Sequence, residues 1–251
     1  MRRIIVIVCT LFLLCGCVSS TRPAAPVSPQ EIQVRLDLAE SYLTGGKPRL
    51  ALQELARLQG AADRVPRYGF DLGLAYLAVG EPALAVKAME QAVTLDPDYG
   101  EAWNNLGRIR ELLGDRKGAE EAYERALSIL TYRTPEFAAY NLAELCRDQG
   151  RIERAEEYGR IAVSKNWRYT PAYLLLAGLD LSRDDPRGAQ EWLEKGAAAN
   201  MADPELLLAL GENLVRLDRI DAARKQFHRI VKDHADSQQA GTALEYLQVL
   251  Q

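Results

Sequence analysis

Small residues recur along this chain in two tracks, and they constrain the fold more than any other feature. Each member of the first track directly follows a leucine, and each member of the second is an alanine. The first track is Ala39, Gly73, Gly107, Ala143, Ala177 and Gly211, and the second is Ala51, Ala85, Ala119, Ala155, Ala189 and Ala223. In both tracks the successive steps are 34, 34, 36, 34 and 34 residues. Two independent tracks with one shared period predict six copies of a single supersecondary unit.

The composition favours helices for these units. Of the 251 residues, 48% are hydrophobic and 26% are charged, which is enough to build a core and unlike a disordered chain. Ala, Leu, Glu and Arg dominate, and β-branched or aromatic residues form no alternating runs. We therefore expect an all-α fold in which each unit is a pair of antiparallel helices that cross at the small residues.

One residue suited to a left-handed backbone stands near the middle of each unit. In the first four units it is a glycine, which adopts that conformation without steric cost. In the last two units it is an aspartate, which does so at a modest cost. We expect these residues to end the first helix of each pair: Gly46, Gly80, Gly114, Gly150, Asp184 and Asp218.

The third unit resembles a known motif. It reads Trp103-x-x-Leu106-Gly107, followed by Gly114, Ala119, Tyr123 and Ala126, and this pattern resembles the tetratricopeptide repeat in content as well as in period. The resemblance implies a right-handed superhelical solenoid of six helix pairs across residues 31–236. A capping helix is expected at 237–251, because a terminal repeat lacks one neighbour. The repeats are expected at about 32–65, 66–99, 100–135, 136–169, 170–203 and 204–236.

The first residues of the chain have the character of an export signal. A basic start is followed by an 11-residue apolar run, Ile4–Leu14, which is too short to span a bilayer as a helix. The run ends in Leu14-Cys15-Gly16-Cys17, which resembles the lipobox of bacterial lipoproteins. That resemblance implies a lipoprotein signal peptide at 1–16 and a lipid on Cys17. An ordinary secretory signal with a coincidental cysteine is the alternative.

The segment after the lipobox is expected to connect the lipid to the folded body. Residues 17–30 are rich in Pro, Ser, Thr and Ala, a composition typical of an extended, flexible tether. By the lipoprotein resemblance, Val18 in place of an aspartate after Cys17 implies anchoring in an outer membrane. We therefore expect a lipid-anchored protein that faces the periplasm.

By resemblance to the tetratricopeptide family, the first helices line a concave groove that binds a protein segment. The residues expected to face this groove form an apolar and aromatic floor with a few polar groups. They are Phe70, Leu74, Leu77, Asn104, Arg108, Phe137, Tyr140, Arg147 and Leu174. Two alternatives stay open: Leu77 packs between neighbouring repeats, and Arg108 and Arg147 are solvated surface charges.

The residue pattern gives no indication of catalysis or of a metal site. His228 and His234 are six residues apart, which does not place them on one helical face as a metal pair. Cys146 takes a motif position at which a tyrosine is common, so we expect a buried packing thiol. A net charge of −4 without a basic stripe argues against nucleic-acid binding. We expect neither catalytic residues nor a cofactor, metal or small-molecule substrate.

The single 36-residue step suggests a narrower family. It places an irregular joint, Leu130-Thr-Tyr-Arg-Thr-Pro-Glu136, before a helix start that reads Asn141-Leu142-Ala143. Together with the lipobox and six repeats, this resembles the pilotin lipoproteins of type IV pilus biogenesis, the group of PilF, PilW and Tgl. The resemblance implies a protein that binds secretin subunits, carries them to the outer membrane and promotes their assembly into the pilus channel.

Two other interpretations remain. One is a lipoprotein scaffold of another envelope system, for outer-membrane-protein assembly or polysaccharide export. The other is an enzyme whose activity the known catalytic motifs do not indicate. The joint itself is either part of the binding surface or a two-residue insertion without function, and the sequence leaves both open.

Overall fold

The computed structural model describes residues 27–201 and 203–250, so the predicted signal peptide, Cys17 and most of the predicted tether lie outside the described residues. Within the described ranges the chain forms thirteen α-helices and no strand. Twelve of them make six helix pairs, and the last one packs on the C-terminal pair. The all-α superhelical solenoid expected from the sequence is confirmed.

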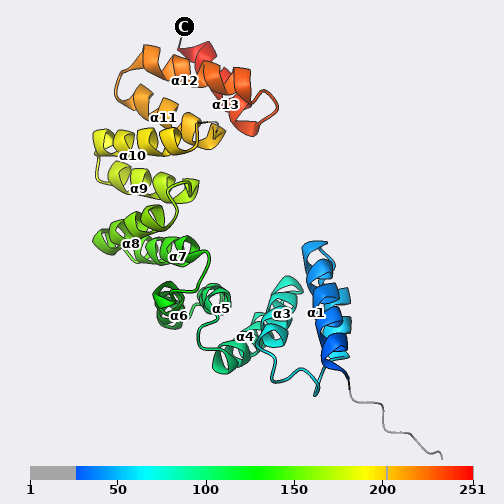
Figure 1. Ribbon diagram of the computed structural model, residues 1–251. Helices are drawn as coiled ribbons and strands as arrows, with labels where there is room; N and C mark the ends of the chain where they lie inside the picture. Colours follow the sequence, from blue (N-terminus) through cyan, green and yellow to red (C-terminus); the bar gives the residue numbers. More distant parts are fainter. Residues whose placement is uncertain (1–26, 202, 251) are drawn as a thin grey trace, which may run out of the picture.

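The pairs follow one another along a curved array (Figure 1). The array bends around α5, with α3 on one side of the bend and α7 on the other. The first helices of the pairs are α1 (Pro29–Thr44), α3 (Pro66–Ala78), α5 (Gly100–Leu112), α7 (Pro135–Asp148), α9 (Thr170–Ser182) and α11 (Pro204–Arg216). The second helices are α2 (Pro48–Ala56), α4 (Pro82–Leu95), α6 (Arg116–Ser128), α8 (Ile152–Lys165), α10 (Pro186–Ala199) and α12 (Ile220–Asp233), and the last helix is α13 (Gln238–Val249).

The turn inside every pair has the backbone that the sequence predicted. The second residue after the end of the first helix is left-handed in all six repeats, which lets the chain reverse direction within a few residues. The φ angles are 67° at Gly46, 85° at Gly80, 82° at Gly114, 70° at Gly150, 57° at Asp184 and 56° at Asp218.

The two tracks of small residues lie where the helices of each pair cross, and all twelve are buried. Where the first helix carries glycine, a large side chain of the second helix fills the space. A Cβ added to Gly107 would lie 2.5 Å from the Tyr123 ring, and one added to Gly211 would lie 2.5 Å from the Phe227 ring. The crossing therefore stays close-packed even though the residues that form it differ between repeats.

Gly69 offers a direct test of this packing, because a Cβ there would meet backbone instead of a movable side chain. It would lie 2.8 Å from the Ala88 carbonyl oxygen and 3.1 Å from the Ala92 nitrogen on α4. We expect Gly69→Ala to lower the free energy of unfolding by about 1–3 kcal/mol, measured by urea denaturation. The control is Gly178→Ala on α9, where a Cβ meets nothing within 4 Å. It should stabilise by about 0.5–1 kcal/mol, and equal midpoints for the two variants would contradict the prediction.

One predicted boundary needs correction. The tether was expected to run to residue 30, but α1 already begins at Pro29. The Ser28 side chain accepts a hydrogen bond from the Glu31 N–H, 3.1 Å away, and proline at the first helical position has no N–H to leave unsatisfied. The cap and the proline together start the helix at residue 29, two residues before its predicted start at 31.

Candidate functional site

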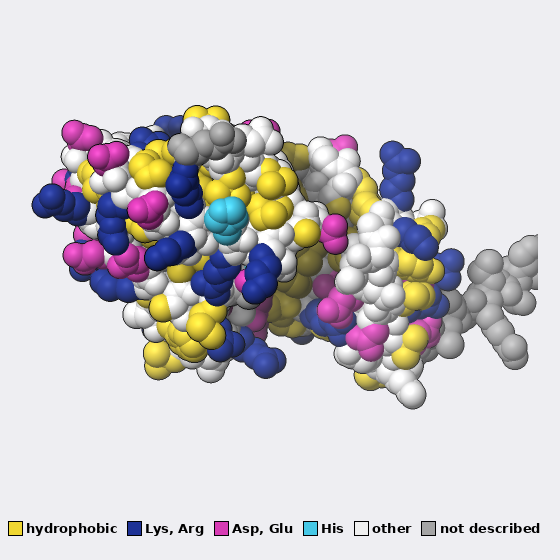
Figure 2. All heavy atoms as spheres, turned by 90° about the horizontal axis from the view of Figure 1, so that it is seen from above, with side chains coloured by type: hydrophobic (Ala, Val, Ile, Leu, Met, Phe, Trp, Pro, Cys, Tyr) yellow, Lys and Arg dark blue, Asp and Glu magenta, His cyan; other side chains and the backbone are white. Residues whose placement is uncertain are grey.

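A hollow of about 430 Å³ opens on the inner side of the bend, between α3, α5 and α7. In the view from above, the side chains visible deep between the later repeats and the first repeat are mainly hydrophobic (Figure 2). We call the 430 Å³ hollow the aromatic hollow. Its lining consists of Phe70, Glu101, Asn104, Asn105, Arg108, Tyr132, Thr134, Phe137, Tyr140, Asn141 and Tyr169.

Phe137, Tyr140 and Tyr169 form what we call the aromatic wall of the hollow, and Tyr169 contacts the other two rings. The Phe137 and Tyr140 rings both meet its ring edge-on, with centroid distances of 5.4 and 5.5 Å. Burial raises the pKa of Tyr140 and of Tyr169 to about 12, so both hydroxyls stay protonated at neutral pH. Phe137 nevertheless leaves 41% of its surface exposed. The wall thus offers apolar ring surface in a fixed arrangement that a partner can cover.

Amide groups from α5 and α7 also line the hollow. The Asn141 side chain donates a hydrogen bond of 2.9 Å to the Asn104 side-chain oxygen, which links α7 to α5. Asn105 donates to the Glu101 carbonyl oxygen at 2.8 Å. Because an amide group carries both donors and acceptors, these groups can satisfy the backbone of a bound peptide. Arg108, which is exposed, adds one positive charge at the hollow.

A second hollow of about 520 Å³ adjoins the first at Tyr140. We call it the charged hollow. The Arg147 guanidinium pairs with Glu144 at 2.5 Å and with Asp148 at 3.0 Å, so its charge is already compensated. Its lining consists of Tyr140, Glu144, Arg147, Pro171, Leu174, Leu175, Gly178 and Glu205. The two hollows together form a strip along the first helices, from Phe70 on α3 to Glu205 on α11.

The structure brings most of the predicted groove residues to this strip. Seven of the nine line one of the two hollows: Phe70, Asn104, Arg108, Phe137, Tyr140, Arg147 and Leu174. Leu74 and Leu77 lie outside both, half-buried against the core between repeats two and three. That these residues bind a partner stays a prediction.

Four residues of the aromatic hollow were not predicted to lie at a binding surface: Glu101, Asn105, Asn141 and Tyr169. Tyr132 and Thr134 belong to the joint, for which a place in the binding surface was one of the two possibilities. A signal existed for Tyr169, because Tyr99 takes the same place at the end of repeat two and likewise packs against a groove aromatic. The Tyr99 and Phe70 ring centroids are 5.0 Å apart. An aromatic residue directly before a first helix, as at Tyr99 and Tyr169, therefore indicates a ring that packs against a groove residue.

The joint between repeats three and four has two sides with different roles. The Tyr132 side chain is 5% exposed and fills the space above Gly100, where a Cβ would lie 2.5 Å from its ring. Tyr132 and Thr134 also line the aromatic hollow. Leu130, by contrast, is 99% exposed. The insertion thus supplies one packing residue, part of the wall of the hollow and one projecting apolar side chain.

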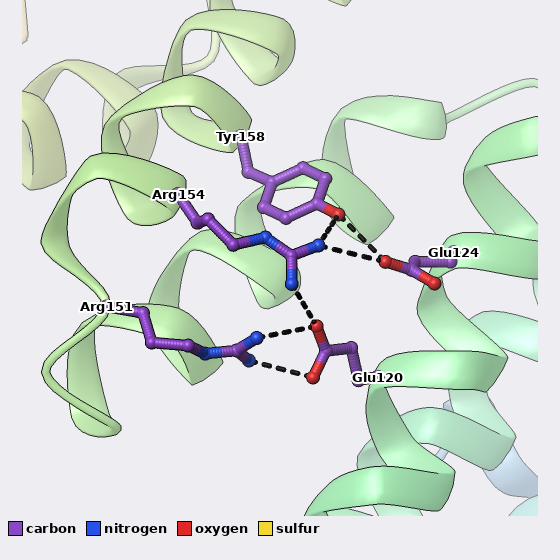
Figure 3. A network of polar contacts seen from close by, with 5 residues as sticks. All are labelled: Glu120, Glu124, Arg151, Arg154 and Tyr158. Atoms are coloured by element: carbon purple, nitrogen blue, oxygen red, sulfur yellow. Dashed lines mark hydrogen bonds and ion pairs between the residues drawn. The ribbon is translucent and has the colours of Figure 1, made fainter.

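A network of ion pairs clamps the repeats on the two sides of the joint (Figure 3). Both oxygens of Glu120 on α6 accept hydrogen bonds from Arg151, at 2.9 and 2.8 Å, and Arg154 donates a third at 3.0 Å. The Tyr158 hydroxyl donates to Glu124 at 2.9 Å. The hydrogen bond from Arg151 lowers the pKa of Glu120. The clamp links α6 to α8, the second helices of the two repeats whose first helices, α5 and α7, line the aromatic hollow.

Reactive side chains lie away from both hollows. Cys146 is fully buried in the core, and burial raises the pKa of its thiol, so it packs as expected. His228 is exposed on α12. In the described ranges no group of His, Cys, Asp or Glu side chains is arranged to hold a metal ion. No helix there combines the length and apolar character needed to cross a bilayer.

Three family models with the description "Tetratricopeptide repeat" match the chain, at residues 70–135, 137–157 and 205–237. They fall on the helix pairs described above. The chain contains tetratricopeptide repeats. The tetratricopeptide array is similar in fold to PilW, a "widely conserved type IV pilus biogenesis factor", with 20% identity and a TM-score of 0.68. The similarity covers 86% of this chain and 100% of that one.

It is equally similar to Pseudomonas aeruginosa pilF, with 18% identity and a TM-score of 0.68, over 86% of this chain and 95% of that one. At such identities the likeness shows the fold alone. Two curated relatives match short stretches of the repeats. Mouse "Protein O-mannosyl-transferase TMTC1" is 40% identical over 73 residues, and a Pseudomonas aeruginosa "TPR repeat-containing protein" is 37% identical over 59. The matches cover 29% and 24% of this chain, but only 8% and 56% of those relatives.

Proposed function

We propose that this tetratricopeptide protein is a non-catalytic scaffold that binds a segment of a partner protein along its concave face. The observation that carries the proposal is the aromatic hollow. The Phe137 and Tyr140 rings are held edge-on against Tyr169, and amides from α5 and α7 line the same hollow. Aromatic side chains bind apolar anchors of a partner, while amides pair with its backbone. The adjoining charged hollow lengthens the strip, which suits a chain segment better than a small molecule.

The partner we propose is the secretin subunit of a type IV pilus, which this protein would help to reach and assemble in the outer membrane. Support comes from the likeness in fold, which covers all of PilW and nearly all of pilF. The joint before α7 supports it further, since residues of that joint line the hollow. The lipobox-like Leu14-Cys15-Gly16-Cys17 supports a lipid anchor on Cys17 and a periplasmic location at that membrane. A scaffold role in another envelope system is the alternative.

The test is a pull-down with the full-length, tagged chain from detergent-extracted membranes, with the secretin quantified. We expect Phe137→Ala combined with Tyr140→Ala to reduce the recovered secretin by at least about tenfold, because two aromatic anchors are lost. Leu84→Ala on α4 is the matched control, since Leu84 is 40% exposed but lies outside both hollows. It should leave recovery unchanged.

Two outcomes would contradict the proposal at different levels. If the double variant recovers secretin like the unmodified chain, the aromatic hollow is not the docking site. If the unmodified chain recovers no secretin, and secretin multimers are normal after deletion of the gene, the secretin is not the partner.

A further inference from the structure

Large apolar side chains project from the connections between successive repeats. The connection after α6 exposes Leu130, that after α8 exposes Trp167, and that after α10 exposes Met201. Their exposed fractions are 99%, 57% and 68%. Single exposed apolar residues are common on any protein. Here one follows the second helix in three consecutive repeats, and every second helix ends on the same edge of the array.

Hydrogen bonds tie these connections into one surface. The Asn166 side chain donates to Glu136 at the start of α7, at 3.0 Å. The Asn200 side chain donates to the Arg168 carbonyl oxygen at 2.9 Å, and Arg229 on α12 donates to the Met201 carbonyl oxygen. Each connection is therefore held by the repeat beside it, and the projecting side chains keep their places along the edge.

Exposed basic groups lie beside Leu130, Trp167 and Met201, which we call the three tips. Arg133 and Arg168 lie on the connections, Lys165 ends α8, and Arg229 and Lys232 lie on the last two turns of α12. Of these five, only Arg229 takes part in an ion pair of the described residues, with Asp233 at 3.8 Å. We call the three tips and these five residues the loop edge.

Most acidic groups close to the tips have partners within the protein. Asp233 pairs with Arg229 at 3.8 Å, whereas Asp236 beside Lys232 is exposed. Glu136 is 7% exposed and accepts from Asn166. Asp203 accepts from the Thr170 hydroxyl at 2.6 Å and from the Glu205 N–H at 2.9 Å. Repeat two differs, because its connection carries Asp96 and Asp98. In the view from the C-terminal end, Lys and Arg side chains stand beside hydrophobic ones (Figure 2).

We propose that the loop edge binds the interfacial layer of a bilayer that contains anionic lipids. The tips project singly and line neither hollow, so they lack the packed concave surface that a protein partner covers. A bilayer, in contrast, can bind apolar side chains that project one by one. Tryptophan favours the headgroup level, leucine and methionine enter the acyl boundary, and Lys and Arg pair with lipid phosphates. The Arg168 guanidinium lies 4.6 Å from the Trp167 ring centre, which presents both groups together.

The location of Trp167 tests this proposal. The full-length chain is mixed with vesicles of phosphatidylcholine and about 30 mol% phosphatidylglycerol that contain brominated lipid, and tryptophan emission is recorded. Bromine quenches only rings in contact with the bilayer. We expect a quenched component that Trp167→Phe removes and that weakens between about 0.05 and about 0.5 M salt. Trp192→Phe is the matched control, since it removes a tryptophan of α10 away from the tips and should keep that component.

Quenching that is the same in the unmodified chain and in both variants would overturn the proposal. So would a quenched component that is equally strong in purely neutral vesicles. If Leu130→Ser and Met201→Ser abolish recovery of a protein partner while Trp167 stays unquenched, the loop edge is a protein interface instead. The readout reports where Trp167 lies and does not depend on the secretin, so its outcome is separable from that of the proposed function.

Discussion

Replacing Phe227 by alanine is expected to lower the free energy of unfolding by about 3–5 kcal/mol. The Phe227 side chain is fully buried, occupies the space that Gly211 leaves open and stacks on the Tyr246 ring at a centroid distance of 4.7 Å. Removing the ring opens a cavity between α11 and α12 and also takes away the surface on which α13 packs. Alanine cannot fill either space, so both contacts are lost together.

The loss of stability caused by Phe227→Ala should be confined to the C-terminal helices, because each repeat of a solenoid packs only on its neighbours. Hydrogen exchange of the variant is expected to show faster opening of α12 and α13, while α5 and α6 keep their protection. Phe137→Ala is the matched control, since Phe137 is 41% exposed on the aromatic hollow. It should change stability by less than about 0.5 kcal/mol while it weakens partner binding. Equal urea midpoints for the two variants would contradict the assignment of Phe227 to the core.

Asp71→Asn is expected to stabilise the protein at alkaline pH. The Asp71 carboxyl on α3 is 3% exposed, and its nearest cation is Arg67, whose Nε lies 3.5 Å away. Arg67 also pairs with Asp37 and Glu40 on α1, each at 2.7 Å. Burial raises the pKa of Asp71 from 3.8 to about 7. Arg67 opposes this rise, and Glu40 and Asp37 add to it.

The sign of the pH dependence follows from this shift. Between pH 3.8 and about pH 7 the folded protein keeps a proton on Asp71 that the unfolded chain has released, so stability falls as the pH rises through this window. Asparagine has no such proton. The advantage of Asp71→Asn should therefore grow from pH 5 to pH 8 by an amount on the order of a few kcal/mol. Urea denaturation at the two pH values measures it.

Asp37→Asn provides the control for the Asp71 experiment. It removes a more exposed partner of the same Arg67 and should cost less than about 1 kcal/mol at both pH values. If Asp71→Asn gives the same difference in stability at pH 5 and pH 8, the buried carboxyl does not hold its proton in the folded protein.

Much of the fold was predictable because it depends on features within one repeat. The twelve small residues mark the helix crossings, and the six left-handed residues mark the reversals of the chain. Both are local requirements of backbone shape and close packing, so each repeat displays them independently. The candidate site was predictable only in part. The repeat pattern indicates which residues of the first helices face inward, but the distance between neighbouring repeats decides which of them surround a hollow.

The sequence by itself determined the number of repeats, their helix pairs and the residues that turn the chain, since these follow from short-range geometry repeated six times. The tertiary structure alone decided which inward-facing side chains surround a hollow. It places Leu77 against the core and Tyr169 at the hollow. It also decided the burial of Asp71 and the exposure of Leu130. These properties depend on the angle at which one repeat meets the next, and side chains distant in sequence fix that angle.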